Sequence, residues 1–196
     1  MARHTFSKQL QSWLESKGTK TLAQLDDSFG AKSFGVALLL LMSVPALPLP
    51  TGGITHLFEL IALLLSLELI AGRTTLWLPK RWRKMRLGDM LQKKALPKLL
   101  GATRWIERFS RPRFTKLFTN TLGLRIIGAV VFLLTLAAAL APPFFGLDTL
   151  PALGVVMVAL SLLLEDAAMF GIGCLTGIAG IVLEISLGSL ALHLLS

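Results

Sequence analysis

The sequence is poor in several residue types that soluble proteins use. It has one cysteine, Cys174, no tyrosine, and charged side chains at only 16% of its 196 positions, against roughly 25% in globular proteins. One cysteine excludes a disulfide framework and a CxxC metal site. The sequence also lacks a nucleophile elbow, a Walker loop and an HExxH pattern. We therefore expect no enzyme activity, no metal site and no cofactor.

Hydrophobic residues, in contrast, make up 54% of the chain and come in long blocks at 34–47, 54–72, 126–140, 150–164 and 167–192. A helix as long as the second block covers about 28 Å, close to the roughly 30 Å of a hydrocarbon core. The first block is shorter and meets Pro45, Pro48 and Pro50. It forms either a short span or half of a re-entrant hairpin, and we favour the span. The pattern predicts an all-α integral membrane protein with about five transmembrane or re-entrant helices.

Positive charge is concentrated in one part of the chain. Residues 73–125 contain fifteen of the 20 Lys and Arg residues and two acidic residues, and no Lys or Arg follows Arg125. A basic segment between apolar blocks is typical of a cytoplasmic loop, so we expect no binding of nucleic acid despite the net charge of +9. The N-terminal segment is also basic, which places the N-terminus in the cytoplasm with two spans between the basic segments.

Both basic segments have amphipathic parts. Thr21 and Gln24 fit a capping box at the start of a short helix whose apolar residues would face the membrane. Between residues 74 and 125, tryptophans and leucines are interleaved with the cations, as at a membrane interface with anionic lipid. We predict amphipathic basic helices on the cytoplasmic surface, with a solvated linker as the alternative for the second segment.

These patterns divide the chain into four parts. They are a cytoplasmic amphipathic segment (1–33), a first membrane hairpin (34–73), a basic interfacial segment (74–125), and a second hairpin with a last transmembrane helix (126–196).

The two hairpins resemble each other in sequence. Phe34-Gly35 precedes an apolar run that ends at prolines, as Ile127-Gly128 does 93 residues later. After the turn, 62–68 resembles 159–165 at a shift of 97, which pairs Glu68 with Glu165. We predict an internal duplication with broken-helix turns, as in many transporters, and the even number of intervening spans favours parallel over inverted repeats. The turn residues are Pro45, Pro48, Pro50, Gly52, Gly53, Pro142, Pro143 and Gly146.

Acidic residues in or beside the apolar blocks are the candidate functional groups, because each costs roughly 2.5–3.5 kcal/mol to insert into a membrane. Glu68 lies about one helical turn before Arg73 and either lines a polar cavity or pairs with that arginine. Glu165 and Asp166 are adjacent. They form either a cation- or proton-coupling site or a cytoplasmic turn between two spans.

Two further candidates lie at the start of an apolar block, one lies in a turn, and one lies deep inside the last block. His56 and Glu59 are three residues apart, so they would share a helix face and relay a proton, with an external interface position as the alternative. Asp148, in the second turn, is expected to be exposed. Glu184 has no cation near it in the sequence and needs a partner on another helix, a bound proton or contact with water.

Several motifs together resemble the bacterial ExoD family of exopolysaccharide synthesis proteins, over about residues 20–190. They are the stretch from Thr21 to Gly35, the turn from Pro45 to Gly53, Gly72-Arg73, Trp77-Leu78-Pro79 and Leu164-Glu165-Asp166. The resemblance implies a multi-pass protein of the bacterial inner (cytoplasmic) membrane that is associated with exopolysaccharide production. It implies no reaction, since such a phenotype can follow indirectly from altered ion or solute balance.

We favour a small transporter of a solute or ion, coupled to protons or cations through the carboxylates. The expected pathway residues are Glu68, Glu165, Asp166, Glu59, His56 and Arg73. Five short helices enclose little space, which favours a homodimer, and the expected partners are membrane lipids, especially anionic ones, and the solute or ion. The alternative is a non-transporting assembly factor of the polysaccharide machinery. An enzyme acting on lipid-linked sugar would need an acid/base or metal cluster that the sequence does not offer.

Overall fold

A computed structural model of the chain describes residues 6–16, 21–47, 54–77, 96–108, 110, 114–141 and 147–195. Of the predicted turn residues, only Pro45 falls inside these ranges; Pro48, Pro50, Gly52, Gly53, Pro142, Pro143 and Gly146 lie outside them. As predicted, the regular structure in the described residues is helical. The helices are α1 (Phe6–Glu15), α2 (Leu22–Phe29), α3 (Ala31–Met42), α4 (Ile54–Ile70), α6 (Leu96–Glu107), α7 (Lys116–Thr119), α8 (Thr121–Leu140), α9 (Thr149–Leu164) and α10 (Ala167–Leu195).

Two of the described helices are long and apolar enough to cross a membrane. They are α8, with 20 residues, and the part of α10 from Ala167 to Leu187, with 21. The apolar helices α3 and α9 are shorter, and the 12 residues of α3 cover only about 18 Å. Large apolar side chains are exposed along one side of α10, including Leu175 and Ile185, as expected for a lipid-facing helix. Membrane association is therefore supported by both length and exposure.

Local signals in the sequence account for the helix starts. Thr21 is the N-cap of α2, and its hydroxyl accepts a hydrogen bond from the Gln24 N–H at 3.2 Å, as the predicted capping box requires. The Asn120 side chain caps α8 by accepting from the Leu122 N–H. Because of this cap, α8 starts at Thr121, before the apolar block itself, and Arg125 becomes part of the helix.

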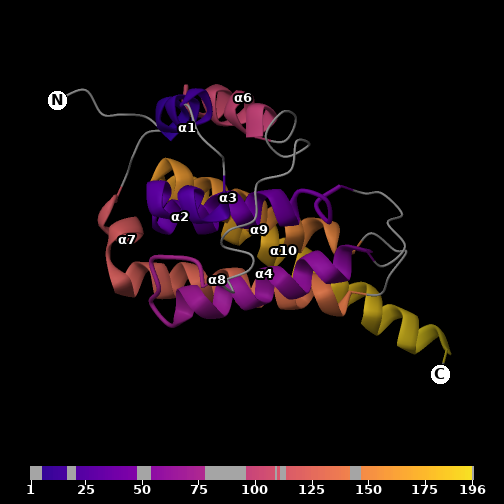
Figure 1. The fold of residues 1–196 in the computed structure, drawn as a ribbon. Coiled ribbons are helices and arrows are strands. Elements are labelled where there is room, and N and C mark those ends of the chain that lie inside the picture. Colours follow the sequence, from indigo (N-terminus) through magenta and orange to yellow (C-terminus); the bar gives the residue numbers. More distant parts are fainter. Residues whose placement is uncertain are drawn as a thin grey trace.

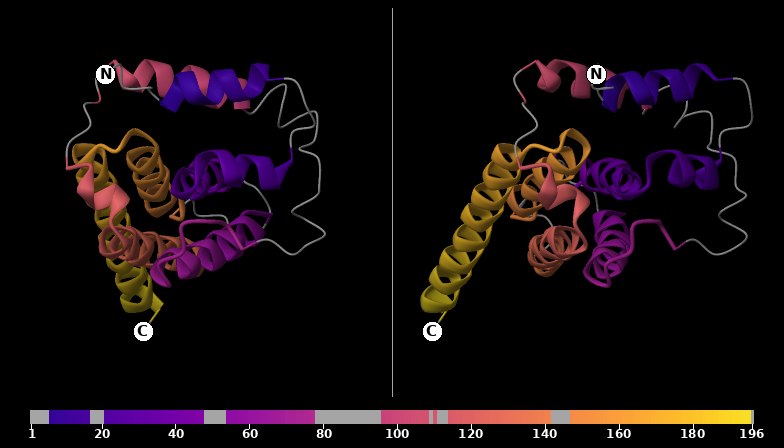
Figure 2. Two further views of the ribbon diagram at one scale, coloured as in Figure 1. Left: turned by 60° about the vertical axis from the view of Figure 1, so that its left-hand side comes forward. Right: turned by 90° about the vertical axis from the view of Figure 1, so that its left-hand side faces the viewer.

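The apolar helices form one bundle of two hairpins. In Figure 1, α3 and α8 both run from left to right, while α4 and α9 return in the opposite direction. Helix α4 packs against α8, α3 packs against α9, and α10 packs against α9. The view from the end at which α3 and α8 begin (Figure 2, right) shows the bundle close to end-on, with α10 splayed to one side. The hairpins are therefore parallel repeats, related by rotation about an axis along the bundle.

Close helix contacts give the register of these repeats. A Cβ atom added to Gly35 of α3 would lie 2.8 Å from Leu163 Cδ2 of α9, and one added to Gly128 of α8 would lie 2.7 Å from Ile70 N of α4. Both differences, 128 − 35 and 163 − 70, equal 93. The first halves of the hairpins thus pack on the second halves of the opposite hairpins in equivalent ways.

The helix ends show the same register and correct the predicted pairing. Gly72 after α4 and Glu165 after α9 both have positive φ angles, of 81° and 55°. The next residue in each hairpin donates its N–H five residues back, Arg73 to the Glu68 carbonyl at 3.1 Å and Asp166 to the Ser161 carbonyl at 3.2 Å. Glu68 is therefore equivalent to Ser161, and its predicted pairing with Glu165 is wrong by one helical turn.

A separate layer of two helices lies on the bundle. Helices α1 and α6 pack together and run across the bundle instead of along it (Figure 2). Phe6 and Leu10 of α1 and Leu96 and Leu99 of α6 are buried in one apolar cluster that also contains Leu163 of α9. The Ser7 N–H donates to Glu107 Oε1 at 3.0 Å, which ties the start of α1 to the end of α6. This layer contains one helix, α6, of the basic segment, whereas α1 had no counterpart in the sequence prediction.

Candidate functional site

The predicted site residues separate into two groups at opposite ends of the bundle. Glu68, Arg73, Glu165 and Asp166 lie where α4 and α9 end, which we call the basic end because Lys32 and Arg125 also lie there. His56 and Glu59 lie in the first turns of α4, at the other end. Nine helical residues separate Glu59 from Glu68, or about 13–14 Å along the axis.

At the basic end, Glu68 holds the chain that follows α4. Its Oε2 accepts a hydrogen bond from the Trp77 N–H at 2.7 Å, and Arg73 lies within electrostatic range. Asp26 of α2 acts in parallel, because its Oδ1 accepts from the Leu76 N–H at 2.9 Å and from Ser33 Oγ at 2.8 Å. Two carboxylates thus bind consecutive backbone amides, which is a structural role for Glu68.

Glu165 and Asp166 form the turn between α9 and α10, in agreement with the turn interpretation. Glu165 ends α9 in the left-handed conformation, and its Oε1 forms an ion pair with Lys32 Nζ at 2.8 Å. Asp166 is buried and caps α10, since its Oδ1 accepts from the Ala168 N–H at 2.9 Å. Its Oδ2 accepts from Ser110 Oγ at 2.7 Å. Asp166 therefore joins the basic segment to the bundle.

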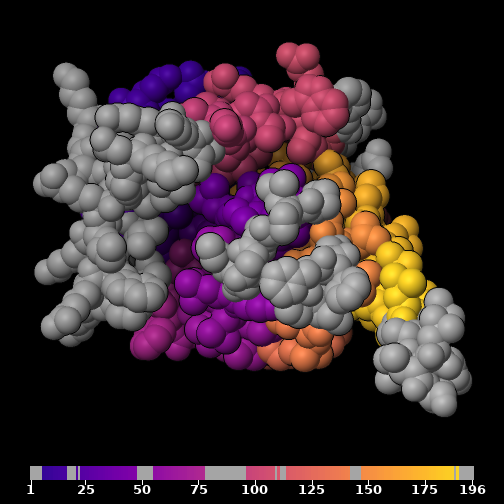
Figure 3. All heavy atoms as spheres, turned by 90° about the vertical axis from the view of Figure 1, so that its right-hand side faces the viewer, coloured from indigo at the N-terminus to yellow at the C-terminus, as the bar shows by residue number. Residues whose placement is uncertain are grey.

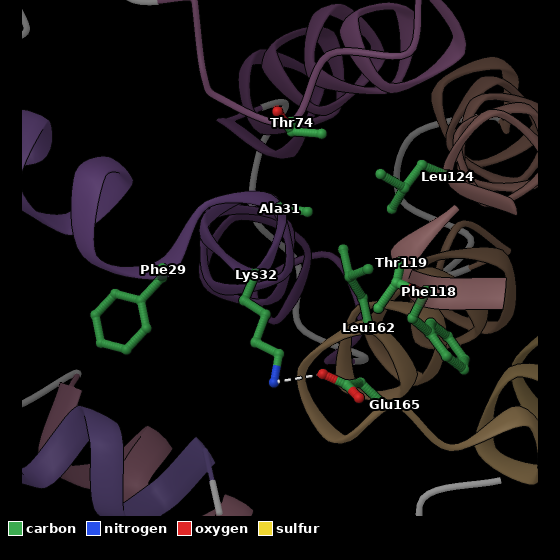
Figure 4. Close-up of a pocket in the computed structure, with 9 residues that line it drawn as sticks. All are labelled: Phe29, Ala31, Lys32, Thr74, Phe118, Thr119, Leu124, Leu162 and Glu165. Carbon is green, nitrogen blue, oxygen red and sulfur yellow. Dashed lines mark ion pairs between the residues drawn. The ribbon is translucent and has the colours of Figure 1, made fainter. Parts of the chain in front are cut away.

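A cavity of about 270 Å³ opens at the basic end (Figure 4). Of the predicted site residues, only Glu165 lines it. The other lining residues are Phe29, Ala31, Lys32, Thr74, Phe118, Thr119, Leu124 and Leu162. Glu68 and Asp166 are not among the lining residues, so the three carboxylates at the basic end do not share this cavity.

At the other end, Glu59 is completely buried, with 0% of its surface exposed. Its Oε2 lies 2.7 Å from Nδ1 of His56, whose side chain is 40% exposed. Within the described part of the chain, Glu59 Oε1 has no hydrogen-bond partner. The predicted pair therefore exists, and it joins a buried carboxylate to a partly exposed imidazole.

Two further carboxylates lie close to this pair. Asp148, which the sequence predicts to be exposed, is half-buried, and burial raises the pKa of its carboxyl while nearby His56 opposes that rise. Asp148 also lies within electrostatic range of Glu59 and of Glu184 on α10. We call His56, Glu59, Asp148 and Glu184 the acidic cluster. Figure 3 looks onto this end of the bundle, where α10 projects beside the other helices.

Several buried polar atoms in and beside the acidic cluster have no hydrogen-bond partner among the described residues. Besides Glu59 Oε1, the buried atoms Glu184 Oε1 and Thr149 Oγ1 have no partner among the residues described. Within the same ranges, no group of three His, Cys, Asp or Glu side chains is placed to hold a metal ion. The arrangement is suited to holding protons, because neighbouring carboxylates in a low-dielectric site are stable when they share them.

The sequence identified only half of this cluster. His56 and Glu59 are found by their spacing on one helix, but Asp148 and Glu184 come from the turn before α9 and from α10. The available signal was the position of Glu184 in an apolar block without a cation nearby. That signal predicts a partner on another helix but does not say which one.

Comparison with known proteins gives one family. The family described as "Exopolysaccharide synthesis, ExoD" matches residues 6–186. The chain is also 31% identical over 189 residues to the uncharacterized protein slr1875 of Synechocystis sp., a match that covers 95% of this chain and 87% of that protein. No solved structure matches the chain.

Proposed function

Because the chain belongs to the ExoD family of exopolysaccharide synthesis proteins, we propose that it is a small proton-coupled transporter of a solute or ion. It lies in the bacterial inner membrane with its N-terminus and basic end in the cytoplasm. Its effect on exopolysaccharide production follows from the solute or ion balance that it maintains. The proton-handling residues are those of the acidic cluster, which replace Glu68, Glu165 and Asp166 in that role.

The observation that carries this proposal is the burial of Glu59. Burying a carboxylate in an apolar bundle costs free energy. The second oxygen of Glu59 also lacks a hydrogen-bond partner among the described residues, so packing alone does not explain why a glutamate occupies this position. A bound proton removes the charge. His56 contacts the other oxygen and reaches the surface, which supplies a route by which that proton enters or leaves.

The repeats support the same proposal. Two parallel hairpins that pack on each other through equivalent glycine contacts can shift as units without breaking either hairpin. The exposed apolar side of α10 is the surface that we assign to lipid and to a second copy of the chain in a homodimer. The five apolar helices α3, α4, α8, α9 and α10 are the membrane-embedded elements, with α3 as a partial span.

Proton flux tests this function. The purified full chain is reconstituted into liposomes with a trapped pH-sensitive dye, and a potassium diffusion potential drives proton entry. We expect faster entry than in protein-free liposomes, and we expect Glu184→Gln to slow it by about tenfold or more, since positioned proton-transfer groups contribute at least that much. If the reconstituted chain adds no proton flux under any ionic condition, the transporter proposal is overturned.

The second candidate function is an assembly factor, and the geometry at the basic end favours it. Glu68 and Asp166 hold a loop and a helix start there, while α6 exposes Lys98, Arg104 and Trp105. Such a factor would dock anionic lipid or a cytoplasmic partner. Charge reversals across Lys80–Arg86, outside the described residues, would then abolish exopolysaccharide production in cells, while Glu59→Gln would leave it intact. The transporter proposal predicts the reverse: Glu59→Gln should abolish exopolysaccharide production, while the charge reversals should leave it intact.

A further inference from the structure

The cavity at the basic end has an unusual combination of walls. Its polar groups are one ammonium, one carboxylate and two threonines, contributed by Lys32, Glu165, Thr74 and Thr119. Its remaining walls are apolar or aromatic, and its volume of about 270 Å³ is just below the roughly 300 Å³ at which small-molecule sites begin. Figure 4 shows the ion pair at one edge, between α3 and α9, and Thr74 at the opposite edge.

The ion pair at this edge is free to open. Lys32 and Glu165 side chains are 24% and 26% exposed. The Glu165 backbone already ends α9, so its side chain does not cap the helix. The neighbouring Asp166 differs, because its two oxygens bind Ala168 and Ser110. Opening the Lys32–Glu165 pair therefore breaks no helix cap and releases no loop.

The charge balance of the cavity selects the kind of ligand. An anion alone would pair with Lys32 and leave Glu165 without a partner, and a cation alone would do the reverse. Each case leaves one partly desolvated charge unpaired, which is unfavourable. A group that carries both charges replaces one ion pair by two. The apolar walls then contact the part of the ligand that follows its polar group.

We propose that this cavity binds a group with a primary ammonium and a phosphate, the headgroup chemistry of an aminophospholipid. The ammonium pairs with Glu165 and the phosphate with Lys32. The cavity lies at the helix ends, the depth of lipid headgroups in a membrane. Phe29, Phe118 and Leu162 then face the glycerol and the first part of the acyl chains. This site is separate from the acidic cluster and does not depend on proton coupling.

Lipid retention by the full chain in detergent tests the site. Native mass spectrometry is used to compare dioleoylphosphatidylethanolamine with dioleoylphosphatidylglycerol and dioleoylphosphatidylcholine. We expect the ethanolamine lipid to bind about tenfold more tightly, a difference of about 1.4 kcal/mol. The glycerol lipid lacks the cation, and the quaternary choline cannot donate a hydrogen bond to Glu165. The double variant Lys32→Gln/Glu165→Gln should bind all three lipids equally.

Arg125→Gln is the matched control. Arg125 is the repeat equivalent of Lys32, at 125 − 32 = 93, and lies against Gly72 where Lys32 meets Glu165. This variant removes one cation from the same end of the bundle but, among the described residues, breaks no ion pair with a carboxylate, so we expect the lipid preference to persist. Lys32→Arg should also keep it and serves as a second test if the double variant fails to fold.

The outcomes separate the possible ligands. Displacement of the lipid by water-soluble glycerophosphoethanolamine would support the ammonium–phosphate chemistry with a free solute as its source, and resistance to it would support the lipid. Tighter binding of the glycerol lipid would overturn the proposal in favour of an anion site. Equal binding of all three lipids by the wild-type chain, without binding of the soluble compound, would overturn it entirely.

Discussion

Glu59→Gln is expected to reduce proton flux in liposomes by about 10²-fold, within the range by which positioned proton-transfer groups act. Glutamine has nearly the same shape and keeps a hydrogen bond to His56, which lies 2.7 Å from the carboxylate. It cannot take up or release a proton. The fold is therefore preserved while the proposed chemistry is lost. The measurement is the initial rate of dye acidification after a potassium diffusion potential is applied.

Glu165→Gln is the matched control for this experiment. It also neutralises one carboxylate beside the bundle, but at the opposite end, where the side chain pairs with Lys32. We expect its proton flux to stay within about twofold of the wild-type rate, because Glu165 lies at the opposite end of the bundle from the acidic cluster. Equal loss in both variants would argue for a general effect on folding. Wild-type flux in Glu59→Gln would remove the acidic cluster from the mechanism.

Structural and proton-handling carboxylates cannot be told apart from the sequence alone, because both kinds lie in or beside apolar blocks. Glu68 and Asp166 border apolar blocks, yet their oxygens accept backbone N–H groups from Trp77 and Ala168. Such bonds satisfy the carboxylate and order a loop or a helix start. Glu59 lies within α4, and its Oε1 accepts no hydrogen bond from the described residues. Its second oxygen therefore needs a proton or a partner from elsewhere.

Much of the helical architecture could be predicted from the sequence. Apolar blocks predict α4, α9 and α10 to within a few residues, because long hydrophobic runs leave few alternatives. The cap at Thr21 is also recognisable, since it depends on residues three apart. In contrast, α1 was not predicted as a helix, although Phe6, Leu10 and Trp13 recur at helical spacing. Its packing partner α6, about ninety residues away, could not be identified from that pattern.

The repeat shows where sequence reasoning fails for a physical reason. Leucine- and alanine-rich helices shifted by four residues keep the same face toward the core, so the pairings at 93 and 97 look equally good. The contacts of Gly35 with Leu163 and of Gly128 with Ile70, together with the equivalent helix ends at Gly72 and Glu165, distinguish them. The acidic cluster was incomplete for the same reason, because its members on different helices meet only after the register is known.

Gly128→Ala is expected to destabilise the bundle by forcing two of its helices apart. The added Cβ would lie 2.7 Å from Ile70 N and 2.7 Å from Leu69 Cβ, so α8 and α4 must move apart. Overpacking of this kind lowers the free energy of unfolding by about 1–3 kcal/mol. Gly35→Ala should cost less. Its nearest neighbour is the end of the Leu163 side chain, at 2.8 Å, and its backbone contact with Ala159 O is longer, at 3.1 Å.

Gly171→Ala is expected to raise the free energy of unfolding of the same bundle. A Cβ at Gly171 of α10 has no described atom within 4 Å, so alanine there only improves helix propensity, by about 0.5–1 kcal/mol. Thermal unfolding in one detergent should therefore rank the midpoints as Gly171→Ala above wild type, then Gly35→Ala, then Gly128→Ala. Equal midpoints for Gly35→Ala and Gly128→Ala would contradict the distinction between side-chain and backbone contacts. A midpoint of Gly128→Ala at or above that of the wild type would contradict the close packing of α8 on α4, and with it the 93-residue register of the two hairpins.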